Sequence, residues 1–135
     1  RVSCNVFESA STRTLSFSAS RDGRGVSLTN AQFPRAGGSP AAGGCSVTVQ
    51  EDNTYQGACS GSPPTEATPC QVNNVEFTTD GSGRSLITGN IYCVGISPAA
   101  APGIDREVTA PGSDSVAGMT PLEFNLYDCS GYTPD

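Results

Sequence analysis

The segment CSVTVQEDNTYQGAC, residues Cys45–Cys59, carries the pattern that decides the fold. Apolar and polar residues alternate on both sides of a central Glu-Asp-Asn, whose residue types tolerate turn conformations. A hairpin centred on these residues places all the inward positions on one side of a two-stranded ribbon, which predicts a cross-strand disulfide. The facing pairs are Val49 with Tyr55, Val47 with Gly57, and Cys45 with Cys59.

The same alternation, with a period of two, recurs along the chain and is interrupted by Gly, Pro, Asn and Asp. It predicts an all-β fold of eight or nine strands. This turn density favours an antiparallel two-sheet β-sandwich, jelly-roll or immunoglobulin-like, with a β-barrel as the alternative. Long loops are expected at Pro34–Gly44, Ser60–Pro69 and Ser97–Asp105. Strands are expected at Val2–Glu8, Arg13–Ser20, Val26–Phe33, Cys45–Gln50, Thr54–Cys59, Gln71–Thr79, Arg84–Val94, Arg106–Thr109 and Pro121–Cys129.

A second hairpin is expected about Asp80–Gly83, an Asp-Gly-Ser-Gly sequence. A symmetric register there puts Cys70 opposite Cys93. The same register would turn Glu76 towards the face that carries two isoleucines of the partner strand. A β-bulge or a slipped register is therefore expected in this hairpin.

The chain has 135 residues, which fit one disulfide-stabilised β domain over residues 1–135. Only 36% of the residues are hydrophobic, so the core is thin and disulfides are expected to carry part of the stability, about 2–4 kcal/mol each. Single cysteines in even number, without a C-x-x-C pair, are typical of a disulfide framework in an oxidising compartment. Fifteen connectivities are possible. The preferred set is Cys45–Cys59, Cys70–Cys93 and, by elimination, Cys4–Cys129.

The chain contains neither histidine nor lysine. Ser-His-Asp, Cys-His, Ser-Lys and Schiff-base chemistry therefore have no residues to use, and the cysteine spacing fits no zinc site. Paired carboxylates, such as Glu51 with Asp52 or Asp105 with Glu107, leave a glycoside hydrolase as a third alternative, which needs two carboxyl groups about 5–10 Å apart. The prediction is a protein that is not an enzyme, with no catalytic residue, cofactor or metal.

The net charge of −6 comes from 13 acidic residues against seven arginines. Without a basic patch, the chain is not expected to bind nucleic acid or anionic lipid. No run of about 18 apolar residues occurs, so no direct membrane span is predicted. The Asp-Gly loops at Asp22–Gly25 and Asp80–Gly83 lack the spacing of a calcium loop and are interpreted as hairpin turns.

A sugar-binding surface usually presents exposed aromatic rings on one face. Most aromatic residues here fall within expected strands, where core packing is the default. Tyrosine tolerates partial exposure best, so the four tyrosines are the candidates for ligand contact. They are Tyr55, Tyr92, Tyr127 and Tyr132.

Several stretches around the cysteines resemble the small exported lipoprotein-type β proteins of myxobacteria and their relatives. They are CSVTVQEDNTYQGAC, PPTEATPCQV, LITGNIYCVGI, REVT and FNLYDCSG, within about residues 45–131. The resemblance implies an exported, disulfide-bonded β domain and transfers no active site. A mature lipoprotein begins at its acylated cysteine, whereas Cys4 follows three residues. By this comparison the chain has been trimmed or is not anchored by its N-terminus.

Together these observations predict an extracellular or cell-surface protein whose export signal is absent from this chain. The expected role is structural, as a subunit of an extracellular assembly such as a filament, coat or surface layer. Self-association, or association with another extracellular protein, is expected through unprotected strand edges, because the chain lacks lysine, the commonest charged edge protector. The alternative is a monomeric extracellular module that binds a glycan or a protein through its loops.

Overall fold

The computed structural model describes residues 2–21, 24–35, 45–50, 54–94, 96–98 and 122–134. These ranges contain nine strands and no helix. Each strand end agrees with an expected one to within two residues, except in β8, which lies in an expected loop. The strand expected at 106–109 falls outside the described residues. The strands are β1 (Val2–Glu8), β2 (Thr12–Arg21), β3 (Arg24–Pro34), β4 (Cys45–Gln50), β5 (Thr54–Ser60), β6 (Cys70–Thr79), β7 (Ser85–Cys93), β8 (Ser97–Pro98) and β9 (Leu122–Tyr127).

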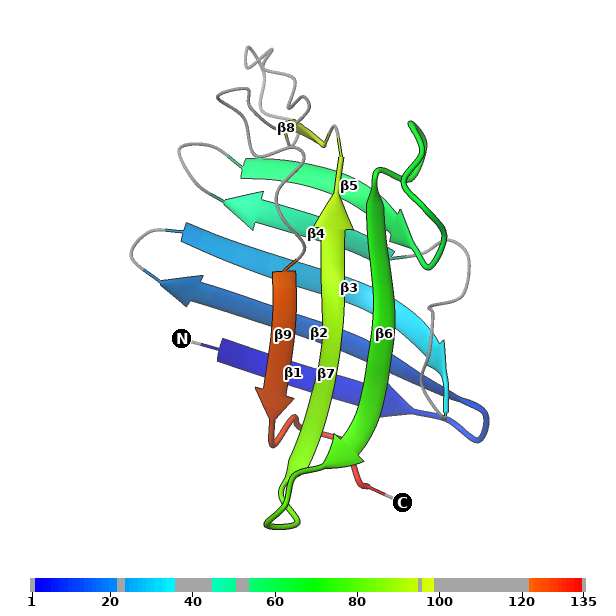
Figure 1. Ribbon diagram of the computed structural model, residues 1–135, viewed down its shortest axis with the longest axis vertical. Coiled ribbons are helices and arrows are strands. Elements are labelled where there is room, and N and C mark those ends of the chain that lie inside the picture. The colour runs from blue at the N-terminus through cyan, green and yellow to red at the C-terminus, as the bar shows by residue number, and fades with distance from the viewer. Residues whose placement is uncertain are drawn as a thin grey trace.

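All nine strands belong to one sheet, in the order β1-β2-β3-β4-β5-β6-β7-β9, with β8 paired to β5. In Figure 1, strands β1 to β5 form a rear layer, and β6, β7 and β9 cross in front of it. The layers are joined where β5 pairs with β6 in parallel, through Cys59 with Cys70 and Ser60 with Gln71. The expected two-sheet sandwich is therefore not confirmed, and the barrel alternative fits. Alternation shows which side chains face inward, but it does not show which strands pair where the layers meet.

The core lies between the two layers and is filled by the inward residues of each long strand. Strand β4 shows the alternation clearly, with Cys45, Val47 and Val49 buried and the residues between them partly exposed. Aromatic rings join the layers. Phe17 of β2 lies 4.9 Å from Phe124 of β9, measured between ring centroids.

Two β-bulges bend the sheet. In β3, Asn30 has a left-handed φ of 57°, and its amide donates to Ser16 Oγ at 3.0 Å. In β6, Asn74 has a φ of 55°, and the register with β7 shifts between Asn73 and Glu76. The second bulge is the one predicted from the sequence. It places the exposed Glu76 opposite Thr88, away from the core.

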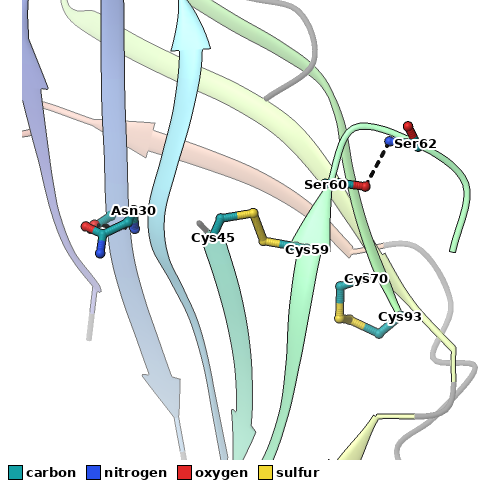
Figure 2. Close-up of a disulfide and its surroundings, with 8 residues drawn as sticks. Asn30, Cys45, Cys59, Ser60, Ser62, Cys70 and Cys93 are labelled. Carbon is teal, nitrogen blue, oxygen red and sulfur yellow. Dashed lines mark hydrogen bonds between the residues drawn. A yellow bond between two sulfur atoms is a disulfide. The ribbon is translucent and has the colours of Figure 1, made fainter. Parts of the chain in front are cut away.

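The three predicted disulfides are present. Cys45–Cys59 and Cys70–Cys93 lie close to each other where β5 meets β6 (Figure 2), with Cα–Cα distances of 5.3 and 4.0 Å. The predicted hairpin registers are also confirmed, since Cys45 faces Cys59 and Cys70 faces Cys93. Cys4–Cys129 joins β1 to the segment after β9, with a Cα–Cα distance of 4.9 Å.

Candidate functional site

The sheet closes where the chain leaves β9 and runs beside β1. Asp128 has a φ of 54°, and at this corner the chain passes from the front layer to the rear one (Figure 1). The Ser130 amide donates to the Cys4 carbonyl at 3.2 Å, and the Val6 amide donates to the Ser130 carbonyl at 2.7 Å. Gly131 has a φ of 82°, and a Cβ there would run into the Val6 carbonyl. We call this junction between β1 and the chain from residue 122 to 134 the seam.

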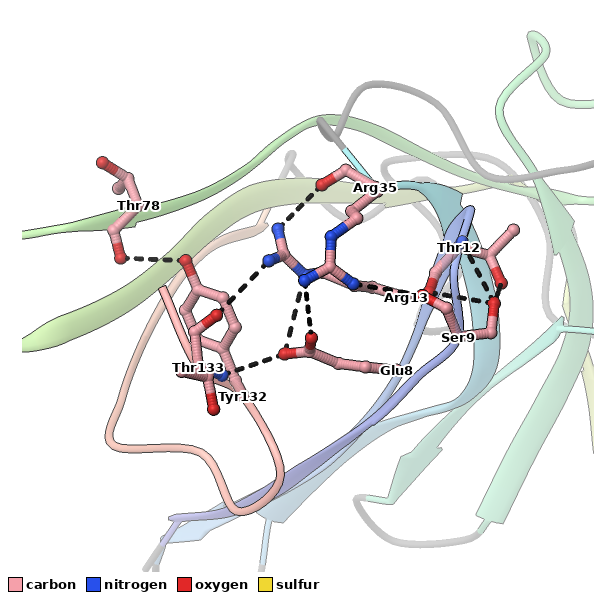
Figure 3. Close-up of polar contacts among 8 residues, drawn as sticks. All are labelled: Glu8, Ser9, Thr12, Arg13, Arg35, Thr78, Tyr132 and Thr133. Carbon is pink, nitrogen blue, oxygen red and sulfur yellow. Dashed lines mark hydrogen bonds and ion pairs between the residues drawn. The ribbon is translucent and has the colours of Figure 1, made fainter. Parts of the chain in front are cut away.

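Beyond Gly131 the seam is fastened by ionic contacts (Figure 3). Glu8 at the end of β1 accepts a hydrogen bond from the Thr133 amide at 2.9 Å. Its other carboxylate oxygen lies 3.1 Å from Arg35 Nη2. The Glu8 carboxylate thus ties the C-terminal segment to β1 and to the residue that follows β3.

Arg13 of β2 completes this fastening from inside the fold. Its side chain is only 2% exposed and donates to the carbonyls of Arg35 at 2.7 Å and Thr133 at 3.4 Å. The guanidinium carbon lies 5.0 Å from the ring centroid of Tyr132 and 5.3 Å from that of Phe77, within the range of cation–π attraction. Arg13 Nε lies 3.7 Å from a Glu8 carboxylate oxygen, so the buried charge has an anionic neighbour.

The other half of the seam is open. The Asp128 amide donates to the Ser85 carbonyl of β7 at 3.2 Å, so the backbone groups of Asp128 face β7. In an antiparallel pair, the backbone groups of successive residues point in alternate directions, so those of Tyr127, Asn125 and Glu123 point away from β7. On β1, the bonds of Cys4 and Val6 to Ser130 show that the even-numbered residues face the seam. Within the part of the chain that the structure describes, no strand pairs with this edge of β9.

A groove of about 400 Å³ marks the open half. Val2, at the start of β1, is 59% exposed, and Tyr127, at the end of β9, is 42% exposed. They are two of the three exposed large hydrophobic residues among those described; the third is Phe7. An unpaired strand edge and apolar side chains therefore occur together here. The groove is lined by Val2, Ser3, Cys4, Asn125, Tyr127, Asp128 and Ser130.

Arg84 holds the rim of the groove in place. Its Nε donates to Asp128 Oδ2 at 2.7 Å, and its guanidinium lies 4.6 Å from the Tyr127 ring centroid. The hydrogen bond to Asp128 raises the pKa of the Arg84 guanidinium. In the preceding turn, Asp80 accepts hydrogen bonds from the Ser82 hydroxyl and from the amides of Ser82 and Arg84, and these bonds lower the pKa of its carboxyl. The predicted hairpin turn at Asp80–Gly83 is confirmed.

The four candidate tyrosines do not share a surface. Tyr55 is fully buried, and Tyr132 is buried, with its hydroxyl donating to the Thr78 carbonyl at 3.2 Å. Tyr92 is half-buried on β7. Tyr127 alone among the four is exposed, and it lies at the seam. A tyrosine platform for sugar stacking is therefore not formed by this set.

The acidic candidates Glu51, Asp52, Asp105 and Glu107 lie outside the described residues, as do Asp22 and Gly23 of the first Asp-Gly loop. Among the residues that the structure does describe, no three cysteine or acidic side chains gather as metal ligands. In the same residues, no helix has the length and apolar character needed to cross a membrane.

No known protein family matches the chain, and neither a curated protein nor a solved structure is significantly similar to it. Function is therefore inferred from geometry. Sequence reasoning named Tyr127 but missed Val2 and Asn125, the other main residues of the seam. Their only signal was their place on the first and last expected strands, which a Cys4–Cys129 bond would bring together.

Proposed function

We propose that this chain is a non-catalytic, exported β domain that acts by association, as a subunit of an extracellular assembly. The open half of the seam is the single observation that carries the proposal. Three disulfides support an oxidising, extracellular setting. The resemblance to exported lipoprotein-type proteins is consistent with the same location.

The edge of β9 offers what strand addition requires. Tyr127, Asn125 and Glu123 each direct one amide and one carbonyl outward, and an added strand gains affinity from pairing such groups. Natural proteins usually protect an exposed edge with charged side chains, lysine above all, with proline or with a bulge. Among the described residues of β9, Glu123 is the one charged side chain, and neither lysine, proline nor a bulge occurs. Val2 and Tyr127 add apolar area beside the edge, which suits the centre of an interface.

A second copy of the chain is the partner that fits this edge. Two β9 strands related by a twofold axis through Asn125 pair antiparallel, with Tyr127 of each copy opposite Glu123 of the other. This register forms three hydrogen-bonded pairs, so every outward amide and carbonyl of the three residues is used. A twofold interface is self-complementary, and it is the commonest symmetry of soluble oligomers.

The test is the concentration dependence of the oligomeric state, measured by light scattering and sedimentation from micromolar to millimolar concentration. Asn125→Pro removes an amide that faces the seam while leaving the pairing with β7 intact. Asn125→Ala is the matched control, since it shortens the same side chain and keeps the amide. We expect Asn125→Pro to weaken self-association by at least about tenfold, or 1.4 kcal/mol, relative to Asn125→Ala.

Circular dichroism and thiol labelling confirm that each variant is folded and oxidised. Should Asn125→Pro fail to fold, Asn125→Lys places a charge at the twofold axis and is expected to weaken association likewise. A wild-type protein that stays monomeric over the whole range contradicts the proposal. Equal association of Asn125→Pro and Asn125→Ala would show that β9 is not the interface.

A further inference from the structure

Four of the six cysteines form one row across the junction between the layers. The register pairs Cys45 with Cys59 in the hairpin of β4 and β5. It pairs Cys70 with Cys93 in the hairpin of β6 and β7, and Cys59 with Cys70 where β5 runs parallel to β6. Each cysteine of the row is therefore a register neighbour of the next, on four consecutive strands of the sheet. All four side chains are buried and point to the core (Figure 2).

The two central cysteines of the row also satisfy the geometry of a disulfide with each other. Neighbouring strands are about 4.8 Å apart, and disulfides join Cα atoms that are about 4.4–6.8 Å apart. Gly57 lies two residues before Cys59 on the same face, and a Cβ there would be 3.4 Å from Cys70 Sγ. The sulfur of Cys70 therefore lies against β5 as well as bonding to β7. A Cys59–Cys70 bond is compatible with the strand pairing as it stands.

Such a bond would differ from the two present ones in what it connects. Cys45–Cys59 lies within the rear layer, and Cys70–Cys93 lies within the front layer. Among the described residues, β5 and β6 share two register pairs, and neither of these disulfides crosses between the two strands. A Cys59–Cys70 bond would cross there. Exchange along the row would thus replace bonds within the layers by a bond between them.

We infer that the four cysteines form one thiol-exchange site, at which a small thiol of the glutathione class replaces the two hairpin bonds by a Cys59–Cys70 bond. The exchange is a switch that joins the two layers covalently at the β5–β6 junction. The site does not include the edge of β9, so the inference does not depend on self-association.

The exchange proceeds in two steps. The thiolate of the small thiol attacks Cys45 Sγ, because Cys45 is 4% exposed and the other three cysteines are fully buried. A bond forms between the small thiol and Cys45, and the Cys45–Cys59 bond breaks with its electron pair on Cys59 Sγ. The Cys59 thiolate then attacks Cys70 Sγ, and Cys93 leaves as a thiolate that takes up the proton released by the small thiol. Two disulfides are present before and after, so no net oxidation or reduction occurs.

The test on the wild-type protein is incubation with excess reduced glutathione, followed by an acid quench and peptide mapping without reduction. Acid stops the exchange because it protonates the thiolates. We expect a linked Cys59–Cys70 peptide together with glutathione on Cys45 and a free thiol on Cys93. Cys4–Cys129 is the internal control. It lies on β1, three strands from β4, so its reaction with glutathione is expected to give no new bond within the chain.

Two single variants measure the exchange without added thiol. Cys45→Ser leaves a thiol on Cys59, and exchange transfers it to Cys93. Cys93→Ser leaves a thiol on Cys70, and exchange transfers it to Cys45. Thiol labelling in denaturant after the acid quench is expected to find both thiols in each variant. Their amounts should agree to within about tenfold, because the bonds that exchange are of the same type.

Cys4→Ser is the matched control, and it is expected to be labelled at Cys129 alone. Labelling of Cys59 alone in Cys45→Ser and of Cys70 alone in Cys93→Ser would overturn the inference. Reduction of the wild type without any linked Cys59–Cys70 peptide would overturn it as well. Label spread over the row in Cys4→Ser would also do so, because it would indicate general scrambling. Circular dichroism shows which variants are folded, and should one misfold, the other and the wild type decide.

Discussion

The two junctions between the layers of the sheet are built in different ways. Where β5 meets β6, two disulfides formed within hairpins lie side by side (Figure 2), and all four cysteines are buried. At the seam, one disulfide, two backbone hydrogen bonds and a partly buried ionic cluster fasten only half of the junction. In the other half, no strand among the described residues pairs with the edge of β9, which lies beside exposed apolar residues.

The difference separates stability from association. The β5–β6 junction is filled by apolar side chains, and Gly57 allows Ile96 and Pro69 to pack directly against the strand. The seam is instead held by a covalent bond, by the two backbone hydrogen bonds of Ser130 and by charges, all of which involve only a few residues and need no continuous strand pairing. A junction fastened in this way can remain open at one end without loss of the fold, and that open end is available to a partner.

Loss of the Cys4–Cys129 bond should have the largest effect on stability. Its sequence separation is 125 residues against 14 for Cys45–Cys59, and the chain-entropy estimate gives about 5 kcal/mol for the longer loop against about 3 kcal/mol for the shorter one. Urea unfolding of Cys4→Ala/Cys129→Ala and Cys45→Ala/Cys59→Ala compares them directly. A lower stability of the Cys45→Ala/Cys59→Ala variant would contradict this prediction, because the β5–β6 junction would then depend more on its disulfide than the seam does.

Arg13→Met should have the next largest effect, about 3 kcal/mol of unfolding free energy. The change leaves the carbonyls of Arg35 and Thr133 without their donor and removes the buried cation next to Glu8. Arg35→Met is the control, because the Arg35 side chain is partly exposed and its pair with Glu8 is expected to contribute about 1 kcal/mol or less. Equal losses in the two variants would show that burial does not distinguish these arginines.

Gly57→Ala tests the packing of the β5–β6 junction, with an expected cost of about 1–3 kcal/mol from overpacking. A Cβ at this position would come within 2.7 Å of Ile96 Cγ2 and 2.8 Å of Pro69 Cγ. Gly81→Ala is the control, since a Cβ there meets nothing within 4 Å. Thermal unfolding measures both variants. A Gly57→Ala protein as stable as Gly81→Ala would mean that the junction is more loosely packed than described.

The smallest effect is expected at Asp80, and it depends on pH. Its carboxyl pKa is lowered below 3.8 in the folded protein by hydrogen bonds from Ser82 and Arg84. A lowered folded-state pKa gives stability that is present above pH 3.8 and is lost as the pH falls through the folded-state value. The stability difference between wild type and Asp80→Ala should therefore shrink in acid. A difference that is constant with pH would contradict this role of the carboxylate.

Much of the local structure could be predicted from the sequence. Alternation with a period of two predicted most of the strands, and the hairpin registers predicted two of the disulfides. The symmetric register of the second hairpin would have turned Glu76 towards the apolar face of its partner strand, which indicated the bulge in β6. The register also placed Tyr55 on the same side as the Cys45–Cys59 bond, which is the buried side, although Tyr55 was considered as a ligand contact. These features follow from the sequence because each depends on residues close together in the chain.

The closure of the sheet was decided only by tertiary structure. The alternation of apolar and polar residues shows which face of a strand is buried. In β5 this alternation would be the same whether β5 were the last strand of a separate sheet or paired with β6. The burial of Arg13 likewise depends on the carbonyls of Arg35 and Thr133, which lie 22 and 120 residues away from it in the chain. The seam and its open edge depend on how the two layers pack against each other, and no local pattern in the sequence specifies that packing.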